Sequence, residues 1–214
     1  MNTATKKHIF VILGTAHGYE VKGKCAPDKS LYEWKWSREI CSRICKELQD
    51  EGYRAIVDHE GNNEIGLSNR AQIVNNYAQH FGKKTTLYVS IHINAAGADG
   101  KWHKATGWES HIAKNASENS KRIANIFWEK AQDLDVKLRR PTPTQNYWEN
   151  NFTVLTKTIS PAILTENMFQ DNKSDVEWLL SKEGKDKIVN LHKEAIKEYI
   201  ATTDANGNEI KKDN

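Results

Sequence analysis

The sequence predicts one α/β domain, built on a mainly parallel, twisted sheet of about six strands with helices on both faces. Two observations lead to this fold class. Short apolar runs typical of strands alternate with longer stretches whose apolar residues recur at helical spacing. The length of 214 residues also suits a single domain with a substantial core better than two domains. We therefore assign residues 1–200 to this domain and residues 201–214 to a polar, flexible tail.

Six runs are predicted as strands, at residues 9–13, 53–57, 86–93, 106–112, 154–155 and 162–165. The first helical stripe consists of Trp36, Ile40, Ile44 and Leu48, and Gly52 follows as a stop signal. Residues 71–81, 123–130, 178–179 and 188–199 predict further helices. Their expected N-terminal signals are Ser68, either Ser117 or Ser120, and a capping box of Ser174 with Glu177. Residues 138–152 are predicted as a long loop, which in a compact domain is often functional.

Composition excludes several classes of protein. The 31 Lys and Arg residues barely exceed the 28 Asp and Glu residues and are scattered, which is no nucleic-acid footprint. No run approaches the roughly 20 apolar residues of a membrane helix. The apolar stretch from Ile9 to Leu13 is too short for a signal peptide, so we expect a protein that is cytoplasmic on synthesis.

Polar residues at the ends of predicted strands indicate a site. In a parallel sheet, ligands bind at the carboxyl ends of the strands. His17 follows the first strand, His92 lies near the end of 86–93, and Glu166 follows 162–165. Glu33 stands at the start of the first helix, after the loop that contains His17. Two histidines and a carboxylate are the ligand set of catalytic zinc sites, which leave a fourth position for water.

Such a site favours amide hydrolysis, because coordination lowers the pKa of water from about 15.7 to about 7. Glu166 would then be the carboxylate that moves the proton. Each residue also has a structural explanation. Glu33 could form a capping box with Ser30, His92 could be a hydrogen-bonded core histidine, and Glu166 could be an ordinary loop residue. His59 also ends a strand at this edge, although a role near the substrate suits it better than coordination.

Several motifs, in order, give a more specific indication: AHG, LYE, SNRAQIVN, VSIHINA, GWESHI and PAILTENMFQDN. From about Ile9 to about Leu180 the chain closely resembles the type 3 family of N-acetylmuramoyl-L-alanine amidases. The resemblance implies that His17, Glu33 and His92 bind one zinc ion and that Glu166 is catalytic. It implies a structural or supporting role for Arg70, and as substrate the bond between N-acetylmuramic acid and L-alanine in peptidoglycan.

The chain departs from the family pattern at three places without losing a presumed ligand or base. Thr15 and Ala16 replace the usual proline and glycine before the first histidine, and Met168 replaces a glycine after the glutamate. An arginine expected after the second strand is missing from DHEGNNE. These departures concern loop geometry and substrate preference.

The function that follows is cell-wall lysis by a zinc amidase, as in a phage or prophage lysin that reaches the wall after release. Two alternatives remain at this stage, a zinc exopeptidase on another acyl substrate and a peptidoglycan-binding protein without catalysis. Among the other polar and aromatic residues, Asn94 could brace the site through its amide, and an ordinary strand-end hydrogen bond would explain it equally well. Trp102 and Trp148 lie in predicted loops that border the crevice and are candidates for contact with sugar rings.

Overall fold

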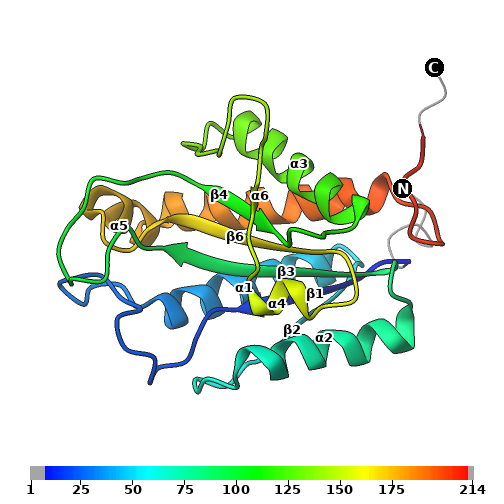
Figure 1. The fold of residues 1–214 in the computed structure, drawn as a ribbon, viewed down its shortest axis with the longest axis horizontal. Coiled ribbons are helices and arrows are strands. Elements are labelled where there is room, and N and C mark those ends of the chain that lie inside the picture. Colours follow the sequence, from blue (N-terminus) through cyan, green and yellow to red (C-terminus); the bar gives the residue numbers. More distant parts are fainter. Residues whose placement is uncertain (1–7, 212–214) are drawn as a thin grey trace.

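The computed structural model describes residues 8–211, which contain six strands and six helices (Figure 1). The elements follow one another as β1 (Phe10–Thr15), α1 (Glu33–Asp50), β2 (Arg54–Val57), α2 (Leu67–Phe81), β3 (Thr86–Asn94), β4 (Glu109–Ile112), α3 (Glu118–Asp133), β5 (Trp148–Glu149), α4 (Thr153–Thr156), β6 (Ala162–Phe169), α5 (Lys173–Leu180) and α6 (Lys182–Ala201). Within this described part, no helix is both long and apolar enough to cross a bilayer.

The strands form one sheet in the order β2-β1-β3-β6-β4-β5. All neighbouring pairs are parallel except β4 and β6, which run antiparallel. The central strands β3 and β6 pair so that His92 lies opposite Glu166, and β4 places Glu109 opposite Glu166 from the other side. The predicted fold class, a mainly parallel sheet of about six strands with helices on both faces, is confirmed.

Alternation along the strands divides the core into two layers. In β3, Leu87, Val89, Ile91 and Ile93 face the large core formed with α1, α3, α5 and α6, while Tyr88 faces the smaller core formed with α2 and α4. Figure 1 shows α2 and α4 on one side of the sheet and α3 and α6 on the other. Each fully buried aliphatic side chain contributes roughly 1.5–3 kcal/mol, so the two layers hold the sheet in place from both faces.

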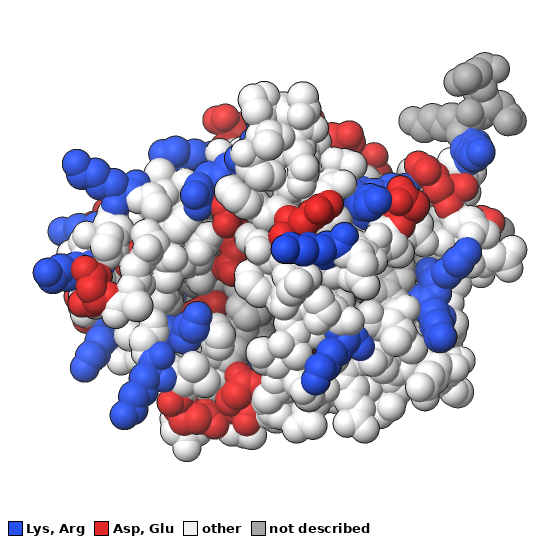
Figure 2. Space-filling model, viewed as in Figure 1, with Lys and Arg blue, Asp and Glu red and all other residues white. Residues whose placement is uncertain are grey.

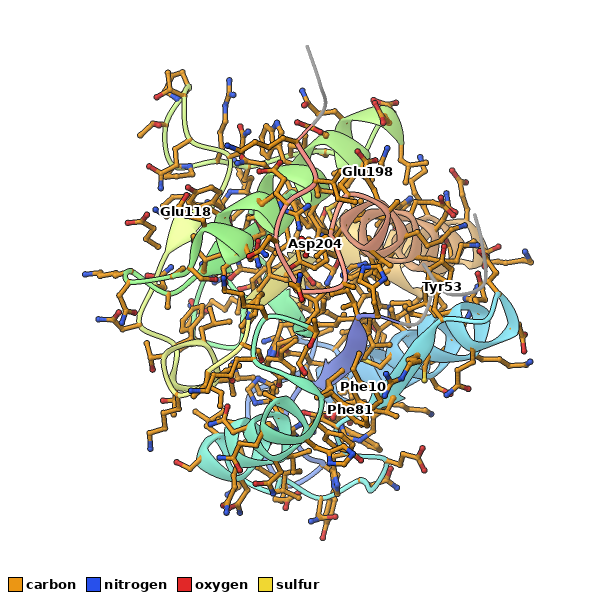
Figure 3. The ribbon with its side chains drawn as sticks, turned by 90° about the vertical axis from the view of Figure 1, so that its right-hand side faces the viewer. Phe10, Tyr53, Phe81, Glu118, Glu198 and Asp204 are labelled. Carbon is orange, nitrogen blue, oxygen red and sulfur yellow. The ribbon has the colours of Figure 1, made fainter. Side chains whose placement is uncertain are left out.

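At the amino edge of the sheet, aromatic rings close the smaller core. Phe10 stacks on Phe81 at 4.5 Å between ring centroids, and the guanidinium of Arg54 lies 4.2 Å from the centroid of Phe81. Figure 3, which looks onto this edge, shows Phe10 and Phe81 side by side. These rings cover the smaller core beside β1 at this end, while its other end, toward the carboxyl edge, opens into a cavity.

Two predictions about strands were wrong. Residues 154–155 belong to the single-turn helix α4, and the second edge strand is instead β5, within the segment predicted as a long loop. Strand β6 also continues beyond the predicted end at Thr165, so Glu166 lies inside the strand and not after it.

The predicted helix starts were partly right. Ser117 caps α3, and its hydroxyl accepts a hydrogen bond from the N–H of Ser120. Helix α2 begins after Gly66, so Ser68 lies inside it, and Asn172 caps α5 in place of Ser174. The predicted mobility of 201–214 stays a prediction. In the described part of that segment, Thr203 is buried and pairs with Glu209.

Candidate active site

A cavity of about 280 Å³ lies at the carboxyl ends of the central strands, on the side of the sheet covered by α2 and α4. His17, His92 and Glu166 line it together, although they are far apart in the sequence. Figure 2 shows this face of the molecule hollowed left of its centre, with acidic atoms deep in the hollow. The strand-end rule thus located the crevice correctly.

His17, Glu33 and His92 form a compact group in which one potential ligand atom of each lies within 4.8 Å of the others. The Oε1 atom of Glu33 is 3.1 Å from Nδ1 of His92, and its Oε2 atom is 3.4 Å from Nε2 of His17. The two imidazole rings stand nearly perpendicular, with centroids 5.3 Å apart. The structure therefore brings together the three residues that the sequence singled out as metal ligands.

The capping-box reading of Glu33 was wrong. The residue before α1 is Tyr32, its side chain makes no capping hydrogen bond, and Ser30 bonds instead to Asp28. Glu33 is only 1% exposed, and its Oε1 accepts a hydrogen bond from the backbone N–H of Ile93. Because a buried carboxylate requires partners, this position points to the site and not to the helix terminus.

The backbone that presents His17 has a conformation uncommon for a non-glycine residue, with φ of 44°. Two arginines hold its carbonyl oxygen: Arg38 donates from Nη2 at 2.8 Å and Arg70 from Nη2 at 3.3 Å. Arg70 is itself buried and pairs with Asp58 at 3.1 Å. Arg70 thus supports the loop of His17, the kind of role that the resemblance implies, and Arg38 shares that contact although sequence reasoning missed it.

The departures from the family pattern before His17 fit this arrangement. Thr15 donates its backbone N–H and its hydroxyl to Oδ1 of Asp58, and its hydroxyl accepts from Arg70. The N–H of Ala16 donates to the hydroxyl of Ser37. These bonds position the loop without the usual proline and glycine. Met168, which replaces a glycine, has φ of 61° and so occupies the left-handed region that glycine adopts without strain.

Burial controls the ionisation of the group. It lowers the pKa of His17 to about 4, against the opposing effect of the Glu33 charge, so this imidazole is neutral at pH 7. Burial alone would raise the pKa of Glu33, but the hydrogen bond and charge of His92 outweigh it and lower the pKa. A neutral imidazole and an ionised carboxylate are the forms that coordinate metals.

Glu166 has the opposite character. Burial, and then the charges of Glu33 and Glu109, raise its pKa well above the usual value, while Lys24 acts to lower it. Its Oε2 atom is buried and has no hydrogen-bond partner in the described structure. A carboxyl group on the wall of a cavity, with a raised pKa and an oxygen without a hydrogen-bond partner, is suited to exchanging protons with a bound molecule.

Other residues position the site from behind. The hydroxyl of Ser90 lies 3.1 Å from Nε2 of His92, the ring nitrogen that does not contact Glu33. Asn167 donates from its side chain to the carbonyl oxygen of His92 at 2.8 Å. Sequence reasoning assigned neither residue a role. Ser90 could have been found, because on a strand it shares a face with His92, two positions on.

Asn94, Trp102, Trp148 and His59 do not reach the cavity. Asn94 donates to Oε1 of Glu109 at 2.8 Å and so braces the neighbour of Glu166.

The two tryptophans also lie away from the cavity. Trp148 stacks on His111, while Trp102 is 38% exposed outside the cavity wall. His59 bonds to the carbonyl oxygen of Asn63 and is not part of the metal-binding group. Contact of these aromatic residues with a substrate stays a prediction, while Phe152, Leu67 and Lys24 line the cavity directly.

The donor set fits a metal ion on the evidence of the side chains alone. The Oε2 atom of Glu33 is buried without a hydrogen bond, as expected for an oxygen whose partner is a cation. The second nitrogen of His92 is held by Ser90, an outer contact typical of metal-binding histidines. Fold and site together define the class, an α/β protein with the residues of a metal-dependent hydrolase.

Comparison with known proteins places the chain more closely. The family model for N-acetylmuramoyl-L-alanine amidases matches residues 11–198, and the chain belongs to this family. It is therefore a hydrolase of the peptidoglycan amidase class, whose members are generally zinc-dependent. The predicted family is confirmed.

Individual relatives agree with this assignment. A sporulation-specific N-acetylmuramoyl-L-alanine amidase from Bacillus subtilis is 28% identical over 60% of this chain and 44% of its own length. The amidase CwlM from Bacillus licheniformis is 30% identical over 55% of this chain and 39% of its own, so the chain spans less than half of these two relatives. The same fold occurs in a crystal structure of an N-acetylmuramoyl-L-alanine amidase from Clostridium difficile 630, with a TM-score of 0.78 at 24% identity, covering 91% of this chain and 97% of that one.

Proposed function

We propose that this chain is a zinc-dependent N-acetylmuramoyl-L-alanine amidase that hydrolyses the amide bond between N-acetylmuramic acid and L-alanine in peptidoglycan. The observation that carries the proposal is the placement of Glu166, a partly buried carboxyl group with a raised pKa, in one cavity with His17 and His92 of the metal-binding group. Family membership supplies the substrate class.

His17, Glu33 and His92 would hold one zinc ion. When bound, zinc supplies a Lewis acid that makes water a stronger nucleophile and stabilises negative charge on the amide oxygen. The chain contributes a preformed cradle for it, since Ser90 fixes the ring of His92 and Arg38 and Arg70 fix the carbonyl oxygen of His17. This support keeps the ligand atoms in position before binding.

Glu166 would act as the general base and then as the general acid. A general base must accept a proton from water and return it to the leaving nitrogen, and it works best when its pKa is near the working pH. The unpartnered Oε2 atom of Glu166 is available for both transfers, and burial raises its pKa from the ordinary value toward that range. Lys24, on the cavity wall, helps to keep the carboxylate ionised and is placed to attract an anionic substrate.

The cavity wall opposite the strands has a mixed character suited to a glycopeptide. Phe152 and Leu67 are 37% and 47% exposed and offer apolar contacts to a sugar ring or to the alanine methyl group. The ring of His111 lies 5.2 Å from that of Phe152, which supports its orientation. We expect the enzyme to act on the wall after release from the cell, as a lysin does; an endolysin of Bacillus phage SPP1 is 25% identical over 55% of the chain.

Digestion of purified sacculi tests the reaction. The amidase should release intact stem peptides with free L-alanine amino termini and leave the glycan chains uncut. Cleavage only between amino acids would instead support an exopeptidase, and binding to sacculi without product would support a non-catalytic protein.

Variants test the roles of individual residues. His17→Ala should lose zinc by elemental analysis because one of three ligands is gone, whereas the matched variant His59→Ala should keep about one equivalent. Glu166→Ala should also keep zinc while turnover falls by orders of magnitude. Full activity of Glu166→Ala, or unchanged zinc in His17→Ala, would contradict these assignments.

A further inference from the structure

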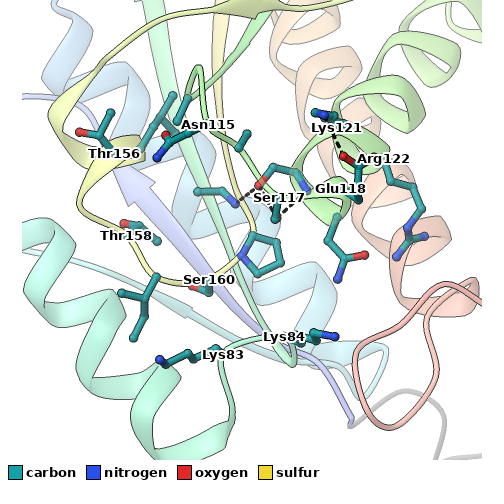
Figure 4. Close-up of a pocket in the computed structure, with 18 of the residues that line it drawn as sticks. Lys83, Lys84, Asn115, Ser117, Glu118, Lys121, Arg122, Thr156, Thr158 and Ser160 are labelled. Atoms are coloured by element: carbon teal, nitrogen blue, oxygen red, sulfur yellow. Dashed lines mark hydrogen bonds and ion pairs between the residues drawn. The ribbon is translucent and has the colours of Figure 1, made fainter.

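A second cavity lies toward the opposite end of the strands, and its volume of about 680 Å³ exceeds that of the active-site cavity. The turn after α2, the start of α3 and the segment between α4 and β6 enclose it (Figure 4). Ala162 lines this cavity, whereas Leu164 and Glu166 line the active site. These three residues alternate along β6, so both cavities open on the same face of the sheet, about 13 Å apart along the strand.

Its rim is positively charged. Lys83 and Lys84 come from the turn after α2, and Lys121 and Arg122 come from the first turns of α3 across the cavity (Figure 4). Glu118 pairs with Lys121 at 2.8 Å, and Glu209 is the other acidic residue of the lining. The guanidinium of Arg122 is bonded to Thr202 and Thr203, which leaves the three lysines as the cations of the rim. Three lysines against two carboxylates still leave an excess of positive charge that favours an anion.

The floor is polar and includes a donor without a partner. Ser160 is only 7% exposed, yet its hydroxyl makes no hydrogen bond in the described structure. A buried hydroxyl is normally paired, so an unpaired one on a cavity wall points to a missing partner. Helix α3 also begins here, and the N–H groups of its first turn lie at the positive end of the helix dipole.

We propose that this cavity binds a phosphate ester of a sugar or polyol. The lysine rim, the start of α3 and the Ser160 hydroxyl supply the contacts of an anionic phosphate. The volume falls in the range of small-molecule sites and far exceeds one phosphate group, and exposed Asn115 and Ser117 offer hydrogen bonds to hydroxyl groups. This site involves none of the proposed zinc ligands, so it is independent of the proposed reaction. At the bacterial cell wall, this cavity would keep the enzyme bound to polymers that carry phosphate groups.

Calorimetric titration at low salt tests the proposal with four probes: glucose 1-phosphate, glycerol 3-phosphate, inorganic phosphate and glucose. At least one ester should bind about tenfold more tightly than both inorganic phosphate and glucose, and the tighter ester distinguishes a sugar from a polyol ligand. Equal binding of inorganic phosphate, or no binding of either ester, would overturn the proposal.

Variants locate the binding. Ser160→Ala should weaken ester binding about tenfold, as for loss of a hydrogen bond to a charged group. It should leave the melting temperature unchanged or higher, because the hydroxyl has no partner in the protein. The pair Lys83→Gln and Lys84→Gln should weaken binding and reduce its salt dependence. The matched pair Lys35→Gln and Lys46→Gln, which removes the same charge from α1, should not. Unchanged affinity in Ser160→Ala and in the Lys83 and Lys84 pair would refute the site.

Discussion

Replacing Glu166 by glutamine should stabilise the metal-free protein above about pH 5, and by more as the pH rises. The side chain is partly buried on the wall of the cavity, and its Oε2 atom is inaccessible to solvent. Burial, followed by the Glu33 and Glu109 charges, raises its pKa well above the ordinary 4.5. Between that ordinary value and the raised value, the unfolded chain has released the proton while the folded chain retains it. Each pH unit of this interval therefore lowers the free energy of unfolding of the wild type by about 1.4 kcal/mol.

Glutamine does not titrate, so the variant lacks this loss. The sign follows from the number of protons bound. Below about pH 4.5, Glu166 is protonated in both the folded and the unfolded wild-type chain, so the free energies of unfolding of the wild type and of Glu166→Gln should differ by a constant. His17 acts in the opposite direction between about pH 4 and 6.5, because burial lowers its pKa, but both proteins contain it. The difference between variant and wild type isolates Glu166.

Denaturant unfolding with a chelator present, at intervals from pH 4 to 8, measures this difference. It should grow with a slope of about 1.4 kcal/mol per pH unit above pH 4.5 and level off at the pKa of the folded state. Glu177→Gln, at an exposed position on α5, is the matched control and should show no such slope. A flat difference for Glu166→Gln from pH 4 to 8 would refute the raised pKa and with it the proposed proton-transfer role.

Two further substitutions test the support of the site. Arg70→Met should lower the free energy of unfolding by about 3–5 kcal/mol, because it leaves the buried Asp58 carboxylate without its cation. Denaturant unfolding measures this loss, and a loss below about 1 kcal/mol would contradict the prediction. Ser90→Ala should weaken zinc binding by roughly 10–100-fold, because Nε2 of His92 loses its hydrogen-bond partner. A chelator competition measures the zinc affinity, and an unchanged affinity would show that Ser90 does not orient the ring of His92.

Where a repeated pattern specifies an element, the sequence was sufficient to predict it. The stripe of Trp36, Ile40, Ile44 and Leu48 is buried on α1, and the alternation in 86–93 correctly located β3. The prediction missed helix α4 and strand β5 for a physical reason. A helix of four residues completes about one turn and a strand of two has no alternation, so neither leaves a period in the sequence.

The site followed the same division. Strand ends identified His17, His92 and Glu166 as neighbours, while Glu33 required the family resemblance because a capping box explained it equally well at the level of sequence. Arg38 and Lys24 were not predicted. Their contributions depend on contacts that only the folded chain creates, namely with the carbonyl oxygen of His17 and with the charge of Glu166.

Strand register explains why the polar side chains of the site lie at the carboxyl ends of otherwise apolar strands. Tyr88, Ser90 and His92 share one face of β3, and Ala162, Leu164 and Glu166 share the matching face of β6. Each strand is apolar where it contacts α2 and α4 and becomes polar where that cover ends. A slip of one residue in β3 would turn His92 toward the large core and expose Ile91 and Ile93 instead. The burial of Leu87, Val89, Ile91 and Ile93 therefore sets the register that places His92 beside Glu33 and opposite Glu166.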